Sequence, residues 1–282
     1  MVSEDDPTFP SLSIKIPAFN WYEREVNDLF GLRAIGHPAR TPLINHGNWE
    51  DDVYPLRKDY QNVVNEKLNN ANENFMHYKG NDITQIPVGP IHAGIIEPGH
   101  FRFGAVGDTI LHLDAKLFYT HRGIEKILEG KSLEAALIVV ERICGVCNVS
   151  HCTAFALALE KITGTVITEK AKLLRILFLE LERLYNHVGD TGNICAGFGF
   201  SFAVSQGGIL KEKLLRLNEE ITGHRYLRGC ISLGGVNVDI DNSDINKILR
   251  FMDELQADYQ ELVEIIFDHE IALNRMVKTG KL

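Results

Sequence analysis

The chain has 282 residues, of which 45% are hydrophobic and 24% are charged, a composition typical of a globular protein with one large core or two domains. Its formal charge of −9 argues against a nucleic-acid partner, because a basic patch is the first requirement of such proteins, and against attraction to an anionic membrane surface. The acidic N-terminus lacks a secretory signal pattern, and no apolar run is long enough to span a bilayer. These features predict a cytoplasmic chain with reduced thiols, in which paired cysteines bind metal or do redox work rather than form structural disulfides.

Composition divides the chain into three parts. The first part is residues 1–60, in which residues 11–60 combine Pro, Trp and Tyr with dense charge and are too short to bury much core alone. Their charged run Glu23-Arg-Glu25 is expected to form a solvated or subunit-facing ion-pair surface. Residues 61–85 are polar and rich in Asn, which predicts a linker. Residues 86–282 then form the main body, for which we predict an α+β fold that is mostly α.

The main body begins with a β element and continues as helices. Residues 93–113 alternate around several glycines, which predicts a short antiparallel hairpin. The six glycines from Gly189 to Gly208 predict a loop. Thr168 is a candidate helix N-cap and Gly164 a candidate C′ residue. Apolar periodicity predicts helices over residues 117–128, 133–143, 153–162, 169–187, 210–221 and 242–266.

The most informative motif is the run from Arg142 to Cys152. Cys144 and Cys147 are separated by two residues, so both sulfurs can point at one ion across a tight turn, and His151 follows one helical turn later. The motif is therefore half of a metal site, and a structural zinc site or buried thiols are alternative interpretations. Cys195 and Cys230 are isolated, and three cysteines are expected to be small core residues: Cys152, Cys195 and Cys230.

Several motifs together resemble a known family. Residues 141–151, 89–103 and 121–126 resemble the large subunit of membrane-bound, energy-converting NiFe-hydrogenases of the formate-hydrogenlyase type, which are relatives of respiratory complex I. Residues 21–38 resemble the C-terminal part of the complex I 30-kDa-type subunit, which precedes the large subunit in formate-hydrogenlyase-type enzymes. The resemblance implies the N-terminal half of a hydrogenase large-subunit-like helical bundle over residues 86–282. It also implies a small antiparallel β element at the start of that bundle and a short remnant of a 30-kDa-type domain ahead of it.

The resemblance also implies site residues. Cys144 would be a terminal nickel ligand, and Cys147 would bridge nickel to the iron of a NiFe(CN)2CO centre. His151 would lie beside a sulfur and tune the metal. Glu97 matches the family's proton-gate glutamate, which needs a partly buried carboxyl, and Glu125 matches a glutamate that binds a structural Mg2+.

Each of these supporting residues has a plainer interpretation. Glu97 could be a turn-side carboxylate, and Glu125 a surface partner of Lys126 or Arg122. The histidines near these motifs could line the site or be satisfied structural groups: His92, His100 and His121. A polar face on the helix near residue 180 is expected to be a structural network: Glu180, Arg183 and His187.

The implied function is that of an oxidoreductase subunit in a multisubunit NiFe-hydrogenase, peripheral on the cytoplasmic face of the inner membrane. Its partners would be an Fe-S small subunit, because this chain has no Fe-S cluster motif, and membrane-arm subunits. The family's second Cys-x-x-Cys is absent, so we expect a chain truncated at both ends and inactive alone, whose missing half could come from a separate chain. The alternatives are a complex I-like NADH/quinone oxidoreductase subunit that shapes a quinone site and a zinc-stabilised interaction module. No nucleic-acid partner is expected.

Overall fold

A computed structural model describes residues 6–39, 41–47, 49–50, 52–61, 82–92 and 97–277. Within it the chain forms two compact units, Met1–Glu129 and Gly130–Leu282. Most of the predicted linker, residues 62–81, lies outside the described residues. The predicted boundaries at residues 60 and 85 therefore stay a prediction.

The first unit begins with a small parallel pair of strands around a helix. β1 (Thr8–Pro10) pairs with β2 (Arg33–Ile35), and α1 (Phe19–Phe30) connects them. α1 ends where Gly31 adopts a left-handed conformation with φ 73°. Leu29 of α1 belongs to a buried hydrophobic cluster with Leu43, Ile44 and Leu56. Trp49 and Phe118 are partly buried and pack against this cluster.

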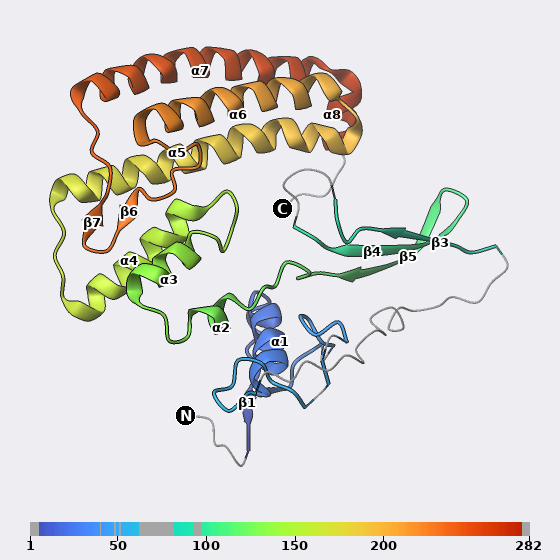
Figure 1. The fold of residues 1–282 in the computed structure, drawn as a ribbon. Coiled ribbons are helices and arrows are strands. Elements are labelled where there is room, and N and C mark those ends of the chain that lie inside the picture. Colours follow the sequence, from blue (N-terminus) through green and yellow to red (C-terminus); the bar gives the residue numbers. More distant parts are fainter. Residues whose placement is uncertain are drawn as a thin grey trace. The chain divides into compact units, whose positions relative to one another are not determined.

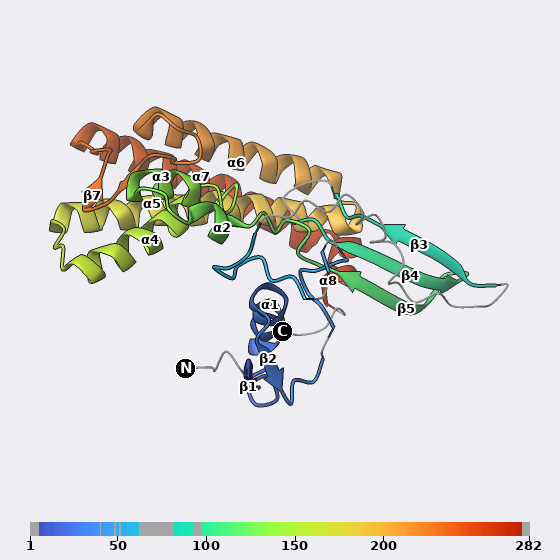
Figure 2. The ribbon, with the colours of Figure 1, turned by 60° about the horizontal axis from the view of Figure 1, so that its bottom comes forward.

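A three-stranded antiparallel sheet completes the β part of this unit (Figure 2). Its strands, in spatial order, are β3 (Thr84–Val88), β4 (His100–Val106) and β5 (Thr109–Lys116). The predicted hairpin over residues 93–113 is thus displaced toward the C-terminus, and residues 93–96 lie outside the described part. The helix predicted over residues 117–128 is reduced to α2 (Ile124–Leu128), because Phe118 and Gly123 adopt left-handed conformations with φ 64° and 63°.

The second unit is helical (Figure 1). Three long helices, α5 (Glu169–Ile194), α6 (Ser201–Thr222) and α7 (Asn242–Asp268), lie side by side. The other elements are α3 (Leu133–Val140), α4 (Asn148–Thr163), the 3-10 turn η1 (Cys195–Phe198), the hairpin β6 (Ile231–Ser232) with β7 (Gly235–Val236), and α8 (Glu270–Val277). As the sequence predicted, the Thr168 side chain accepts a hydrogen bond from the Ala171 N–H at the start of α5, and Gly164 ends α4 in a left-handed conformation.

The loop predicted from Gly189 to Gly208 is wrong over most of its length. α5 continues to Ile194 and α6 begins at Ser201. A Cβ on Gly192 would lie 2.9 Å from the Gly207 Cα, and a Cβ on Gly207 would lie 2.7 Å from the Gly192 Cα. These two glycines therefore permit a close approach of two helices instead of forming turns.

The fold class is confirmed as α+β and mostly α, with small sheets. Among the described helices, none has an apolar stretch long enough to cross a membrane.

Candidate metal-binding site

The cysteine pair lies on the turn between α3 and α4. Cys147 immediately precedes α4, and its carbonyl accepts hydrogen bonds from the Ser150 hydroxyl at 2.8 Å and from the His151 N–H at 3.3 Å. Cys144 and Cys147 form a disulfide, with their Cα atoms 5.3 Å apart. The prediction of free thiols therefore differs from the structure, because the two-residue turn brings the sulfurs within bonding distance. That the two sulfurs bind one ion stays a prediction.

Helix α5 holds the backbone of this turn. Val146, between the two cysteines, has a carbonyl that accepts hydrogen bonds from the Tyr185 hydroxyl at 2.7 Å and from the Asn186 amide at 2.9 Å. Tyr185 is fully buried. Burial, followed by the nearby charge of Glu182, raises the pKa of the Tyr185 hydroxyl, so this group remains a hydrogen-bond donor.

Glu182 fixes the start of α4 from the same face of α5. Its carboxylate accepts the backbone N–H of Val149 at 2.7 Å and of Ser150 at 2.9 Å, and the residue is 4% exposed. The first N–H groups of a helix have no partners within the helix, so a carboxylate placed there satisfies them and complements the helix dipole. Side chains of α5 thus hydrogen-bond the backbone on both sides of Cys147: Tyr185 and Asn186 before it, and Glu182 after it.

The sequence did not identify these three holding residues. These residues are spaced by three and four positions within the apolar face of α5, and this spacing was the only signal in the sequence. The polar residues predicted on the same helix, which include Glu180 and Arg183, have a similar spacing, so spacing alone did not distinguish the two sets. Glu180 and Arg183 form a 3.3 Å ion pair whose side chains are 51% and 61% exposed. That pair lies on the solvent side of α5 and does not reach the turn.

The loop between α6 and β6 supports the turn from another side. The Asn148 side-chain amide donates a hydrogen bond to the Tyr226 carbonyl, and the Gly229 N–H donates to the Glu141 carboxylate at 2.5 Å. Asn148 and Glu141 flank the cysteine pair in sequence and are both buried. The cysteine turn is therefore held by backbone and side-chain bonds from both α5 and this loop.

The remaining cysteines are core residues, as predicted. Cys152, Cys195 and Cys230 are all buried. Burial raises the pKa of Cys152 to about 12 and that of Cys230 to about 11, and it also raises the pKa of Cys195. These thiols remain protonated near neutral pH and are poor metal ligands.

Three of the predicted residues lie in or just before strand β4 of the first unit: His92, Glu97 and His100. The His92 Nε2 lies 2.7 Å from the Gly99 carbonyl, and the His100 Nδ1 lies 3.3 Å from the Gly89 carbonyl, so both rings bond the backbone around the hairpin. This favours the structural interpretation of both histidines. Glu97 is exposed and accepts a hydrogen bond from the Thr120 hydroxyl at 3.5 Å. The expected partial burial of Glu97 is therefore not observed, and its role as a proton gate stays a prediction.

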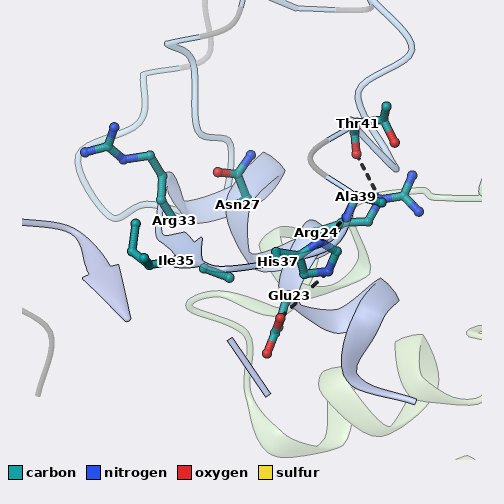
Figure 3. A pocket seen from close by; sticks show the side chains of 9 residues that line it. Glu23, Arg24, Asn27, Arg33, Ile35, His37, Ala39 and Thr41 are labelled. Atoms are coloured by element: carbon teal, nitrogen blue, oxygen red, sulfur yellow. Dashed lines mark hydrogen bonds and ion pairs between the residues drawn. The ribbon is translucent and has the colours of Figure 1, made fainter. Parts of the chain in front are cut away.

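The charged run on α1 differs from its prediction. Glu23 is 5% exposed and accepts hydrogen bonds from the hydroxyls of Ser11 at 2.7 Å and Ser13 at 2.5 Å and from the Leu12 N–H at 2.6 Å. Burial alone would raise the pKa of Glu23, but these hydrogen bonds and nearby His37 together lower it. Glu23 is therefore a fixed anion that anchors residues 11–13. Glu23 and His37 line a pocket of about 140 Å³ between α1 and β2 (Figure 3).

Glu125 lies near two other potential ligands. Its carboxylate, the Glu25 carboxylate and the His121 imidazole each offer an atom within 4.8 Å of the others. The sequence does not connect Glu25 with Glu125, because 100 residues separate them and the intervening chain gives no pairing signal.

The cysteine turn fits a nickel–iron centre in its donor chemistry. Two soft sulfurs that converge from one rigid turn are donors that suit nickel and iron, provided that the disulfide is first reduced to two thiolates. Cys144 and Cys147 would hold the metals there. His151 follows Cys147 by four residues and lies in the first turn of α4.

Three protein families match separate parts of the chain. Residues 1–65 match the family described as respiratory-chain NADH dehydrogenase, 30 Kd subunit. Residues 122–189, which include the cysteine turn, match the family of nickel-dependent hydrogenases. Residues 203–282 match the family described as respiratory-chain NADH dehydrogenase, 49 Kd subunit.

Individual relatives match nearly the whole chain, and they include subunits of hydrogenases and of an NADH-quinone oxidoreductase. The chain is 32% identical to formate hydrogenlyase subunit 5 of Escherichia coli over 100% of its own length and 50% of that protein, and 34% identical to hydrogenase-4 component G of the same organism over 94% and 49%. It is 28% identical to a subunit of the NADH-quinone oxidoreductase of Phocaeicola vulgatus over 99% and 57%. The chain thus spans about half the length of these curated relatives.

A solved structure supports the fold. The chain is similar, with a TM-score of 0.65 and 22% identity over 71% of its length and 53% of the other chain, to a chain in the structure of the membrane-bound sulfane sulfur reductase, an archaeal respiratory membrane complex. At this identity the likeness concerns the fold alone.

Proposed function

Because the chain is a hydrogenase-large-subunit-like protein related to complex I, we propose that it supplies the first two thiolates of a nickel–iron centre in a multisubunit hydrogenase. The observation that carries this proposal is the cysteine turn, which lies inside the region matched by nickel-dependent hydrogenases and is held by buried side chains of α5. We also propose an Fe-S partner subunit as the electron acceptor or donor, and association with a membrane through partner subunits.

In this proposal the chain's own residues have separate tasks. When bound, the nickel–iron centre would supply the place where H2 is split or formed. Reduced Cys144 and Cys147 hold the metals, and a thiolate sulfur can accept a proton there. Tyr185 and Glu182 keep the backbone of the turn in place, so that the two sulfurs stay together. Exposed Glu97, with the Thr120 hydroxyl beside it, is the proposed group for proton exchange with water.

The first testable prediction concerns nickel in the assembled protein. The complex containing this chain, isolated under reducing conditions, is expected to contain nickel and to reduce a viologen dye when H2 is supplied. Cys144→Ser and Cys147→Ser should each abolish both properties, because one thiolate replaced by a hydroxyl removes a soft ligand. Nickel is measured by mass spectrometry of the metals, and dye reduction by absorbance.

The matched control is Cys195→Ala, which removes a buried thiol of the same unit that makes a 3.4 Å contact with the Thr191 carbonyl. It should leave the nickel content unchanged. A complex that holds zinc without nickel and shows no H2-dependent dye reduction would overturn the proposal and favour a zinc-stabilised module.

A second candidate function is a complex I-like subunit that shapes a quinone site. The observation in its favour is that the matches on both sides of the cysteine turn are to the 30 Kd and 49 Kd subunits of the respiratory-chain NADH dehydrogenase. Quinone reduction by the nickel-free complex, sensitive to substitutions in residues 89–103, would favour this function over hydrogenase activity.

A further inference from the structure

One face of α1 packs against the segment that leads into α2. Trp21 and Phe118 make an edge-to-face ring contact with centroids 5.6 Å apart. Glu25 lies four residues after Trp21 on α1 and therefore on the same face of the helix. Because Phe118 is followed closely by His121 and Glu125, this contact brings the Glu25 carboxylate to the two later residues.

These three side chains present their ligand atoms to one another. All three potential ligand atoms lie within 4.8 Å, and the His121 Nε2 is 4.0 Å from a Glu125 carboxylate oxygen. The His121 Nε2 atom is buried and has no hydrogen-bond partner among the described residues. A buried imidazole nitrogen without a partner is costly unless it binds something.

The two neighbouring carboxylates, of Glu25 and Glu125, also favour a bound cation. The Glu25 and Glu125 carboxylates each have an oxygen within 4.8 Å of the other and of the His121 imidazole, so two like charges lie close together. Two carboxylates thus converge on one imidazole, and the side chain of His121 is 21% exposed while that of Glu125 is 56% exposed. A bound dication would offset this repulsion and give the imidazole nitrogen a partner.

We propose that Glu25, His121 and Glu125 bind a divalent transition-metal ion of the zinc type. One imidazole nitrogen with two carboxylate oxygens is a ligand set used for zinc, with water at the fourth position. Mg2+ instead prefers oxygen ligands throughout and keeps several waters, so the imidazole disfavours it. The proposal therefore replaces the Mg2+ that the resemblance implied for Glu125 with an ion shared by Glu125, Glu25 and His121.

Such an ion would connect α1 to residues 121–125 within the first unit. It would join the segment matched by the 30 Kd family to the beginning of the segment matched by nickel-dependent hydrogenases. The site does not depend on the proposed nickel centre, because none of its ligands lies in the second unit.

The test uses the full chain with Cys144→Ser and Cys147→Ser, so that the thiolates do not bind the added metal. Zn2+ binding is measured by calorimetry, and Co2+ is used as a spectroscopic probe of nitrogen and oxygen ligands. One ion per chain is expected, Glu25→Gln and His121→Gln should each weaken Zn2+ binding at least about tenfold, and Zn2+ should raise the melting temperature of the parent only. Mg2+ at equal concentration should not displace Zn2+.

Asp108→Asn is the matched control, because it removes an exposed carboxylate of the same unit outside the cluster. It should leave Zn2+ binding unchanged, and far-UV circular dichroism checks that each variant is folded. If the parent does not bind Zn2+, the cluster is only an ion pair between His121 and Glu125, and the proposal is overturned. Equal binding of Mg2+ that neither Glu25→Gln nor His121→Gln weakens would also overturn it.

Discussion

At the scale of residues, two side chains of α5 share one backbone acceptor in the cysteine turn. Tyr185→Phe removes one of the two hydrogen bonds to the Val146 carbonyl and leaves that of Asn186. We expect the free energy of unfolding to fall by about 1 kcal/mol. The Cys144–Cys147 pair, once reduced, should also react faster with an alkylating agent, because the turn is held less firmly. Urea unfolding and the rate of alkylation measure the two effects.

Tyr22→Phe provides the comparison, since Tyr22 is 65% exposed. It should change neither quantity. If Tyr185→Phe destabilises the protein without changing the alkylation rate, the hydroxyl stabilises the core but does not position the cysteines.

Residue-scale predictions succeeded where the partners are close in sequence. The Thr168 cap depends on a residue three positions away, so the sequence was sufficient to predict it. The bond from the Val149 N–H to Glu182 spans 33 residues, and no local pattern specifies it. Glu23 shows the same limit, because its partners at residues 11–13 lie across a turn and convert an expected surface charge into a buried anchor.

At the scale of elements, glycine explains the largest error. A run of glycines is typical of a loop, but Gly192 and Gly207 face each other across α5 and α6, where any larger side chain would overlap the opposite backbone. Local composition does not distinguish a glycine that permits a turn from one that permits helices to pack closely. The separation of 15 residues between them becomes informative only when the two helices are known to be antiparallel neighbours.

A buried ion pair connects three elements of the second unit. Arg175 on α5 donates to both oxygens of Glu160 on α4, at 3.0 and 2.6 Å, and to the carbonyls of Ser232 and Gly235 in the β6–β7 hairpin. The side chains of Arg175 and Glu160 are 3% and 9% exposed. Removing one charge of such a pair leaves the other unpaired in the interior.

The pair predicts a pH dependence of stability. The Arg175 hydrogen bonds lower the pKa of Glu160, although burial opposes them, so this contribution is complete above the ordinary pKa of Glu and is lost as the pH falls through the lowered value. Glu160→Gln should lower the free energy of unfolding by roughly 3 kcal/mol at pH 6. The difference between the two proteins should shrink as the pH is lowered toward 3, which urea unfolding at several pH values measures.

Asp239→Asn removes the exposed ion pair with Lys170 and serves as the control. Its effect on stability should be small at every pH, because exposed pairs contribute little. A difference between wild type and Glu160→Gln that stays constant from pH 6 to pH 3 would contradict a charged Glu160 in the folded state.

At the scale of the whole molecule, the fold class and the relationship to hydrogenases and complex I could be predicted, because they depend on motifs that lie within short stretches. The contacts between residues 1–60 and the start of the main body depend on partners that lie far apart in sequence. The His46 ring bonds the Leu117 carbonyl at 2.7 Å, and Lys126 donates to the Arg57 carbonyl at 3.1 Å. Such contacts over about 70 residues place the start of the main body in the first unit.

The second unit has its own buried core, which predicts that it folds independently. Phe178, Leu181 and Leu214 are at most 1% exposed and belong to α5 and α6 of this unit. A protein of residues 130–282 should therefore be helical by circular dichroism and should unfold cooperatively in urea. Gly192→Val in the same fragment, which places a branched side chain against the Gly207 backbone, should abolish this cooperativity. A wild-type fragment that is helical but unfolds without a cooperative transition would show that these helices do not form a fixed core by themselves.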